Sequence, residues 1–128
     1  MKPKILIIED NAQNMYLVTF ILEKNNYQVI QASNGLDGIA LAGQEKPDLI
    51  LLDIQLPVLD GYAVARELRK IDSLAHVHII AVTSYAMPGD RDHALSAGCS
   101  GYIEKPINPD TFIAQVKEYL NSPFLGGT

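Results

Sequence analysis

The stretch Asp48-Leu49-Ile50-Leu51-Leu52-Asp53 places four consecutive apolar residues between two carboxylates. A strand that is apolar on both faces is typical of the centre of a parallel sheet, where helices cover each side. Its last residue, Asp53, then lies at the carboxyl end of the strand. The stretch therefore predicts an α/β domain with a polar group at one edge of its sheet.

Similar short apolar runs recur along the chain and alternate with longer segments of helical period. The predicted strands are residues 4–8, 28–32, 48–53, 77–83 and 101–105. The predicted helices are residues 13–25, 35–44, 60–71, 88–97 and 109–120, with Pro88 and Pro109 in first turns. Five βα units with right-handed crossovers predict an α/β, flavodoxin-like, doubly wound parallel sheet with five helices and the strand order 2-1-3-4-5.

Polar residues follow four of these strands. Glu9 and Asp10 come after the first strand, and Asp53 ends the third. Thr83 ends the fourth strand, and Lys105 ends the fifth. Because ligands bind at the carboxyl edge of such a sheet, near the switch point between strands 1 and 3, we expect these residues to share one pocket. Three acids, a hydroxyl and an ammonium group indicate a divalent metal and a phosphoryl group.

Composition and charge limit the class of protein. The chain has 128 residues, of which 48% are hydrophobic and 20% charged, which fits a single domain. A net charge of -5 argues against binding to nucleic acid or to an anionic membrane, because both need a basic surface. No apolar run reaches the roughly 18 residues that a membrane span requires. The single cysteine, Cys99, favours a reducing cytoplasm.

We expect one domain over residues 1–121 and a frayed C-terminal tail over residues 122–128. The tail is rich in glycine and contains Pro123. Phe124 and Leu125 are its candidates for folding back onto the domain.

In this order and at these strand ends, the motifs resemble the receiver domains of two-component response regulators, most of all the small stand-alone receivers. The resemblance covers the chain from residue 4 to about residue 120. Its motifs are Ile8-Glu9-Asp10-Asn11, Leu52-Asp53 with Pro57 and Gly61 downstream, Val82-Thr83, Ala97-Gly98, and Tyr102-Ile103-Glu104-Lys105-Pro106. It implies a module that accepts a phosphoryl group from a histidine kinase or histidine phosphotransfer protein and signals by binding a downstream protein.

The resemblance also implies a role for each polar strand end. Asp53 would be the phosphoacceptor, as a carboxylate at an open strand end suited to in-line attack. Glu9, Asp10, Asp53 and the backbone carbonyl of Gln55 would hold Mg2+, a hard cation that prefers oxygen ligands. Lys105 would place its positive charge on a phosphoryl oxygen.

Thr83 and Tyr102 resemble the switch pair of the family. The hydroxyl would move to the phosphoryl group and the ring would turn inward, which remodels the surface around the fourth helix, the fifth strand and the fifth helix. Pro106 resembles the cis-proline of the family, which would aim Lys105 inward. Tyr85, two residues after Thr83, is expected to crowd the entrance of the pocket.

The first predicted helix carries two aromatic residues outside its apolar stripe. On a helical wheel the core-facing residues are Met15, Val18, Ile21 and Leu22, with Leu17 at the margin. Tyr16 and Phe20, four residues apart, fall on the polar face as an adjacent pair. They pack on each other or under the tail, or they anchor an interface. Because this helix begins at the mouth of the pocket, we favour docking of the phosphodonor.

Two other functions compete with this one. An aspartyl-nucleophile phosphohydrolase would typically carry a second acid two residues after Asp53, where this chain has Gln55. We therefore expect no enzyme activity beyond self-phosphorylation from a phosphodonor and slow self-dephosphorylation. A receiver cut from a hybrid kinase or a DNA-binding regulator would have the same sequence features. For Cys99 and for the histidines we expect structural or surface roles. The histidines are His76, His78 and His93.

Overall fold

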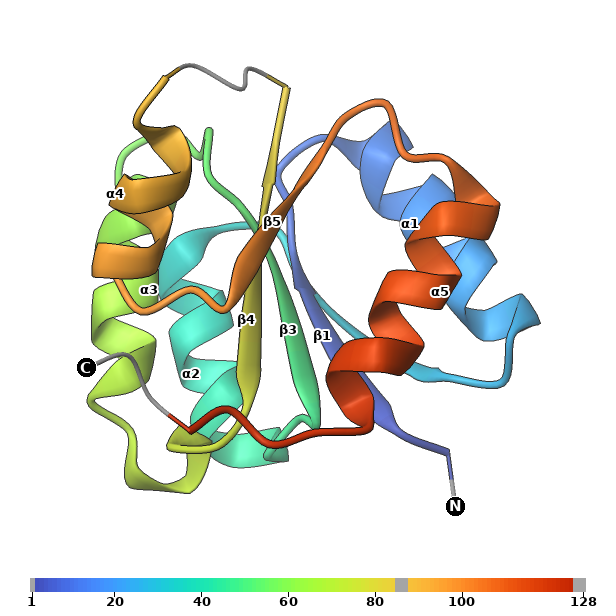
Figure 1. Cartoon of the computed structure of the whole chain (residues 1–128), viewed down its shortest axis with the longest axis horizontal. Helices are drawn as coiled ribbons and strands as arrows, with labels where there is room; N and C mark the ends of the chain where they lie inside the picture. The colour runs from blue at the N-terminus through green and yellow to red at the C-terminus, as the bar shows by residue number, and fades with distance from the viewer. Residues whose placement is uncertain (1, 85–87, 126–128) are drawn as a thin grey trace.

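The chain folds as a parallel sheet with helices on both faces, as Figure 1 shows. The computed structural model describes residues 2–84 and 88–125. The strands are β1 (Lys4–Ile8), β2 (Gln28–Ala32), β3 (Leu49–Asp53), β4 (His78–Thr83) and β5 (Gly101–Glu104). The helices are α1 (Ala12–Lys24), α2 (Gly35–Glu45), α3 (Gly61–Arg69), α4 (Asp90–Ser96) and α5 (Pro109–Leu120), with a short 3-10 helix, η1 (Asp72–Leu74).

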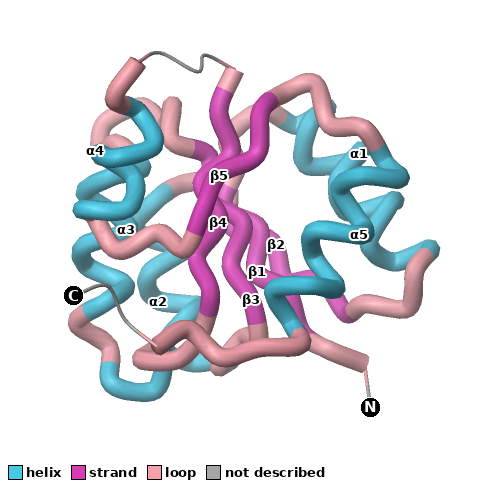
Figure 2. The backbone as a smooth tube through the Cα atoms, viewed as in Figure 1, coloured by secondary structure: helices cyan, strands magenta, loops and turns pink. Residues whose placement is uncertain are grey.

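The strand order is β2-β1-β3-β4-β5, and every neighbouring pair is parallel. Figure 2 shows the helices in two layers, with α1 and α5 on one face of the sheet and α2, α3 and α4 on the other. The predicted fold class and strand order are confirmed. Each predicted bound lies within two residues of the observed one, and η1 was not predicted.

Side-chain caps explain where four helices begin. In each case the oxygen of an Asn or Asp side chain accepts a hydrogen bond from a backbone N–H of the first turn, which has no partner within the helix. The caps are Asn11 for α1, Asn34 for α2, Asp60 for α3 and Asn108 for α5. Pro109 lies in the first turn of α5, as predicted.

The start of α4 differs from the prediction. Pro88 precedes the helix instead of lying in its first turn, and α4 begins only at Asp90. Gly89 between them has a φ of 91°, in the left-handed region that glycine adopts with little strain. This conformation interrupts the helical path immediately after Pro88.

Two hydrophobic clusters fill the space between the sheet and its helices. All five residues of β3 are buried, which confirms that helices cover both faces of this strand. Leu6 and Ile50 belong to the cluster beneath α2, α3 and α4, whereas Ile5 and Leu49 belong to the cluster beneath α1 and α5. Each such side chain contributes about 1.5–3 kcal/mol of transfer free energy when it is fully buried. The sheet is thereby fixed as a rigid base for the loops at its edge.

The predicted core stripe of α1 is observed. Val18, Ile21 and Leu22 are buried, and Met15 packs against the same cluster. Leu17, predicted at the margin, is 43% exposed.

After α5, Ser122–Phe124 turns back along the sheet edge at which the strands begin (Figure 1). The backbone N–H of Phe124 donates to the carbonyl of His76 at 2.9 Å, whereas Leu125 is 82% exposed. The segment that the sequence predicts to fray is therefore bound to the domain as far as Phe124. Among the described residues, no helix has the length and apolarity that a membrane span needs.

Candidate functional site

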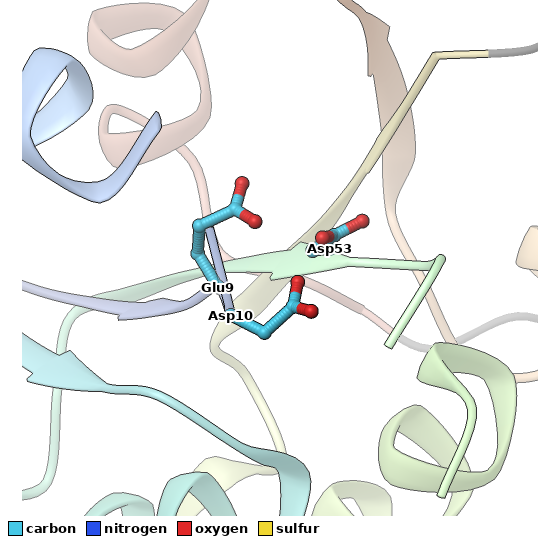
Figure 3. A group of neighbouring side chains, drawn as sticks. All are labelled: Glu9, Asp10 and Asp53. Carbon is cyan, nitrogen blue, oxygen red and sulfur yellow. The ribbon is translucent and has the colours of Figure 1, made fainter. Parts of the chain in front are cut away.

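Three carboxylates converge where β1 and β3 end. Glu9 and Asp10 follow β1, Asp53 is the last residue of β3, and the two strands are hydrogen-bonded neighbours. Figure 3 shows the three side chains pointing toward a common space. One oxygen of each carboxylate lies within 4.8 Å of the others. Glu9 and Asp53 are 5% and 4% exposed, whereas Asp10 is open to solvent.

Lys105 adds a positive charge to this cluster. It follows β5, and its Nζ lies 3.0 Å from Oε1 of Glu9 and 3.6 Å from Oδ2 of Asp53. The backbone N–H of Lys105 donates to the carbonyl of Thr83 at 2.8 Å, which ties this residue to the end of β4. The peptide bond between Lys105 and Pro106 is cis. The carboxylates and the lysine that the sequence predicts in one pocket are thus brought together.

The electrostatics of Asp53 reflect this crowding. Burial is the main cause that raises its pKa, and the hydrogen bonding and negative charge of Glu9 raise it further. The N–H of Gln55, which donates to Oδ1 of Asp53 at 2.9 Å, and the charge of Lys105 act in the opposite direction. One ammonium group does not offset three carboxylates, so a further cation would stabilise the ionised cluster.

The donor set fits a hard divalent cation. Carboxylate oxygens are the ligands that such ions prefer, and the exposed Asp10 leaves a side on which the ion can keep water molecules. Glu9, Asp10 and Asp53 are the one group of His, Cys, Asp and Glu side chains with metal-binding spacing in residues 2–84 and 88–125.

Gln55 connects two loops at the mouth of the site. Its N–H binds Asp53, and its side-chain Oε1 accepts a hydrogen bond from the backbone N–H of Ser84 at 3.2 Å. The side chain therefore joins the loop after β3 to the residue that follows β4. No local sequence pattern identifies Ser84 as the partner of the Gln55 side chain.

Gly61 sets the path of the chain just after Asp53. A Cβ atom at this position would lie 2.4 Å from Cα of Ile54 and 2.7 Å from the carbonyl oxygen of Asp53. Any side chain would push the start of α3 away from β3. This glycine is required for the close approach of α3 to the loop that carries Asp53.

Asn11 also contributes to the site. Its side chain caps α1, and its backbone N–H donates to Oε2 of Glu9 at 3.2 Å. The capping residue therefore binds the carboxylate oxygen of Glu9 that Lys105 does not contact. An Asn just before a helical pattern is a recognisable signal for the cap, but not for the second contact.

Thr83 and Tyr102 lie on neighbouring strands. Thr83 ends β4 and is 7% exposed, and β4 pairs with β5 so that Ala81 is opposite Tyr102. Tyr102 is partly buried and packs against the cluster beneath α2, α3 and α4. Tyr85, expected to crowd the entrance, lies outside the described residues.

The remaining candidates have structural surroundings. Cys99 is buried, and burial raises the pKa of its thiol to about 12, so the thiolate that a nucleophile needs is not formed at neutral pH. His93 stacks on Tyr62 with ring centroids 3.7 Å apart. His76 and His78 bind the segment that follows α5.

A doubly wound sheet with a carboxylate cluster and a lysine at its switch point defines a flavodoxin-like domain with an acidic site that suits a divalent cation. The family model of the response regulator receiver domain matches residues 5–117. The chain belongs to this family.

Relatives of the chain agree with this assignment. It is 43% identical to the polar-differentiation response regulator DivK of Brucella anthropi, over 94% of this chain and 98% of that protein. It is 34% identical to the receiver domain of the sensor histidine kinase PA1611 of Pseudomonas aeruginosa, with a TM-score of 0.88 over 95% of this chain and 100% of that one. That structure has a magnesium ion coordinated in its active site cleft. The chemotaxis protein CheY4 of Vibrio cholerae shares the fold, with 24% identity and a TM-score of 0.90 over 93% of this chain and 99% of that one.

Proposed function

We propose that this receiver domain accepts a phosphoryl group on Asp53 and signals through phosphorylation-dependent binding of a downstream protein. The phosphohistidine of a histidine kinase or a histidine phosphotransfer protein is the donor, within a two-component system. One observation carries the proposal: the carboxylate of Asp53 ends a central strand, within 4.8 Å of two further carboxylates and 3.6 Å from the Lys105 ammonium.

Asp53 is the nucleophile. Its Oδ1 accepts the N–H of Gln55, while its Oδ2 lies toward Lys105. In the transfer an Asp53 oxygen forms a bond to phosphorus as the bond between phosphorus and the donor imidazole nitrogen breaks. The products are an acyl phosphate and a free imidazole. Lys105 then neutralises a phosphoryl oxygen in place of the carboxylates that it contacts before transfer.

We assign Mg2+ to the acidic cluster, with Glu9, Asp10, Asp53 and the backbone carbonyl of Gln55 as its ligands. The ion supplies the positive charge that lets a phosphoryl group approach three carboxylates. Asp53 keeps its place without the ion because the N–H of Gln55 holds it, and Glu9 is held by the N–H of Asn11.

Phosphorylation acts on Thr83 and Tyr102. The Thr83 hydroxyl moves to the phosphoryl group, and the ring of Tyr102 follows, so that the surface of α4, β5 and α5 changes. Slow self-dephosphorylation returns the domain to its first state. Gln55, at the position where a phosphohydrolase carries an acid, supplies no general base, which favours a signalling module over an enzyme.

Tyr16 and Phe20 are the proposed docking site for the donor. They are 71% and 52% exposed, and their rings stack with centroids 6.4 Å apart. Neither Phe124 nor Leu125 covers them, because the ring of Phe124 lies over Arg69 and Leu125 is 82% exposed. The pair thus presents a preformed aromatic surface on the helix that starts beside Glu9 and Asp10.

We also propose the bounds of the domain and the compartment in which the protein acts. We assign residues 1–121 to the receiver domain and residues 122–128 to a C-terminal tail. The single, buried cysteine suits a reducing compartment, and we place the protein in the cytoplasm. Binding of nucleic acid or of a membrane is not part of the proposed function, since the net charge of -5 opposes both.

Mass spectrometry of the intact protein tests the assignment. Incubation with acetyl phosphate and Mg2+ should add one phosphoryl group to the wild type and to Asp60→Asn, but none to Asp53→Asn. Asp60 is a matched control because it caps α3 and asparagine is an equally good cap. Modification that survives Asp53→Asn, or that persists in full after chelation of the metal, would contradict the proposal.

A further inference from the structure

The segment Ser122–Phe124, here called the strap, crosses the edge of the sheet opposite Asp53 (Figure 1). Three hydrogen bonds join it to His76 and His78. The N–H of Phe124 donates to the carbonyl of His76 at 2.9 Å, and Nδ1 of His76 donates back to the carbonyl of Phe124 at 2.9 Å. Nε2 of His78 donates to the carbonyl of Ser122 at 2.8 Å. His78, the first residue of β4, and His76, two residues before it, thus bind the backbone of the strap.

The bond to Ser122 fixes the tautomer of His78. A carbonyl only accepts, so the proton of the neutral ring is on Nε2 and Nδ1 is an acceptor. Nδ1 lies 2.7 Å from Oγ of Ser100, which donates to it and in turn accepts the N–H of Ile79 at 3.3 Å. The strap is therefore linked by hydrogen bonds to the residue that precedes β5.

The side chain of Phe124 covers Arg69, the last residue of α3. The guanidinium carbon lies 3.9 Å from the centre of the ring, within the range of a cation–π contact. Beneath the ring, Arg69 donates to three carbonyls. Nε binds Gly98 at 2.8 Å, and Nη1 binds Leu74 at 2.9 Å and Val77 at 2.7 Å.

Gly98 is the point at which α4 ends. Its φ of 106° lies in the left-handed region, and a Cβ atom there would lie 2.5 Å from Cγ of Arg69. A glycine is thus required here both by the backbone conformation that ends the helix and by the close packing of the Arg69 side chain. α4 has only seven residues, of which Ala94 is the one buried and His93 stacks on Tyr62, and a helix this short depends on its contacts with the rest of the domain. The bond from Arg69 is a tie from α3 to the end of α4.

We propose that the strap is a conformational clamp, which holds α4 in place by shielding the Arg69–Gly98 tie from water. When Phe124 leaves Arg69, water competes for the guanidinium N–H groups, and the last turn of α4 opens more often. Docking of the strap and the position of α4 are then coupled. In the proposed function α4 is part of the surface that phosphorylation remodels, so the strap would bias that surface from the far edge of the sheet.

Hydrogen exchange on the unphosphorylated chain of 128 residues tests the clamp. The N–H groups of Gly98 and Cys99 close the last turn of α4, on the carbonyls of Leu95 and Ala94. Phe124→Ala should speed exchange at both amides about tenfold, as expected for the loss of a partly buried cation–π contact. Leu125→Ala is the matched control, because this neighbouring apolar side chain is 82% exposed. It should leave both rates unchanged.

Exchange at Ile7 in the centre of the sheet separates a local effect from general destabilisation. It should not change in either variant. Arg69→Lys keeps the charge but loses the planar set of guanidinium N–H donors, so it should also speed exchange at Gly98. Adding Phe124→Ala to Arg69→Lys should change the Gly98 rate little further. Unchanged exchange at Gly98 in Phe124→Ala, or equal acceleration at Ile7, would overturn the clamp. Neither result depends on phosphorylation, so the clamp and the proposed function can fail separately.

Discussion

Lys105 and Glu9 form an ion pair inside the site, with Nζ of the lysine 3.0 Å from Oε1 of the glutamate. The same ammonium group is 3.6 Å from Asp53, and the lysine side chain is 14% exposed. One cation therefore balances two buried carboxylates. Removal of Lys105 would leave Glu9 and Asp53 without a positive partner. The competition between this lysine and a metal ion for the same negative charge gives the first prediction.

Lys105→Met should lower stability in a chelator by roughly 2–3 kcal/mol, because breaking a buried ion pair leaves its partner charge uncompensated. Mg2+ should then raise the stability of the variant more than that of the wild type, since the ion relieves a larger repulsion. Urea unfolding with EDTA and with MgCl2 measures both effects. Lys70→Met is the control, because its pair with Glu67 is on the surface and side chains there are 74% and 46% exposed. An equal gain from Mg2+ in all three proteins would contradict the prediction.

Thr83→Ala should separate phosphorylation from its structural consequence. The hydroxyl is proposed to respond to the phosphoryl group and not to attack it, so acetyl phosphate should still modify Asp53. The amide NMR shifts of β5 on phosphorylation should be largely lost, and with them the gain in affinity for a partner. Thr111→Ala, an exposed threonine in the first turn of α5, is the control. Wild-type shifts or an equal affinity gain in Thr83→Ala would refute this role.

Stability should depend on pH through His78. Burial is the main cause that lowers its pKa and the charge of Arg69 lowers it further, while the bond to Ser122 acts in the opposite direction. His78 then binds a proton at about pH 6.5 in the unfolded chain and only at lower pH in the folded protein. The contribution of the neutral ring is present above about pH 6.5 and is lost as the pH falls toward the folded pKa.

Urea unfolding at about pH 7.5 and about pH 5.5 measures this effect. The wild type should lose more stability on acidification than His78→Gln, by less than about 1 kcal/mol because the ring is partly exposed. Asp53 titrates in both proteins, so its contribution cancels in the comparison. Equal losses in the two proteins would show that His78 does not contribute.

Local patterns made most of the fold predictable. The apolar stretch that ends at Asp53 identifies a central strand because burial on both faces permits few polar residues. The carboxyl ends of parallel strands share one edge, so the meeting of Glu9, Asp10 and Asp53 followed from the order of the elements. The same argument brought Lys105 to that edge. These features depend on periodicity and topology, and both are encoded within short segments.

Contacts between distant residues that do not follow from the order of the strands were not predictable in this way. The strap is held by the hydrogen bond between Phe124 and His76, which are 48 residues apart, and by the contact of the Arg69 guanidinium with the Phe124 ring. The link from Gln55 to Ser84 spans 29 residues and joins two loops without a sequence pattern. Such contacts depend on the three-dimensional path of the backbone, which propensity does not determine.

The exposed pair on α1 gives the last prediction. Tyr16 and Phe20 stack at an interplanar angle of 22°, and Nζ of Lys24 lies 5.9 Å from the centre of the Phe20 ring. The pair is ordered by contacts within α1 and contributes little to the core, since Val18, Ile21 and Leu22 of the same helix are the residues that are buried. Large, rigid aromatic side chains of this kind are typical anchors of protein interfaces.

Replacing both residues with glutamine, which a helix tolerates well, should therefore weaken docking of the phosphodonor and leave the stability of the fold nearly unchanged. The melting temperature should change by no more than about 2 °C, and phosphorylation by acetyl phosphate should keep its rate. Transfer from a phosphohistidine protein donor should slow about tenfold or more, the usual effect of losing an interface anchor. Leu36→Gln is the control, because this leucine is 68% exposed on α2, across the sheet from α1. A large loss of stability with unchanged transfer would instead show that the two aromatic residues serve the fold.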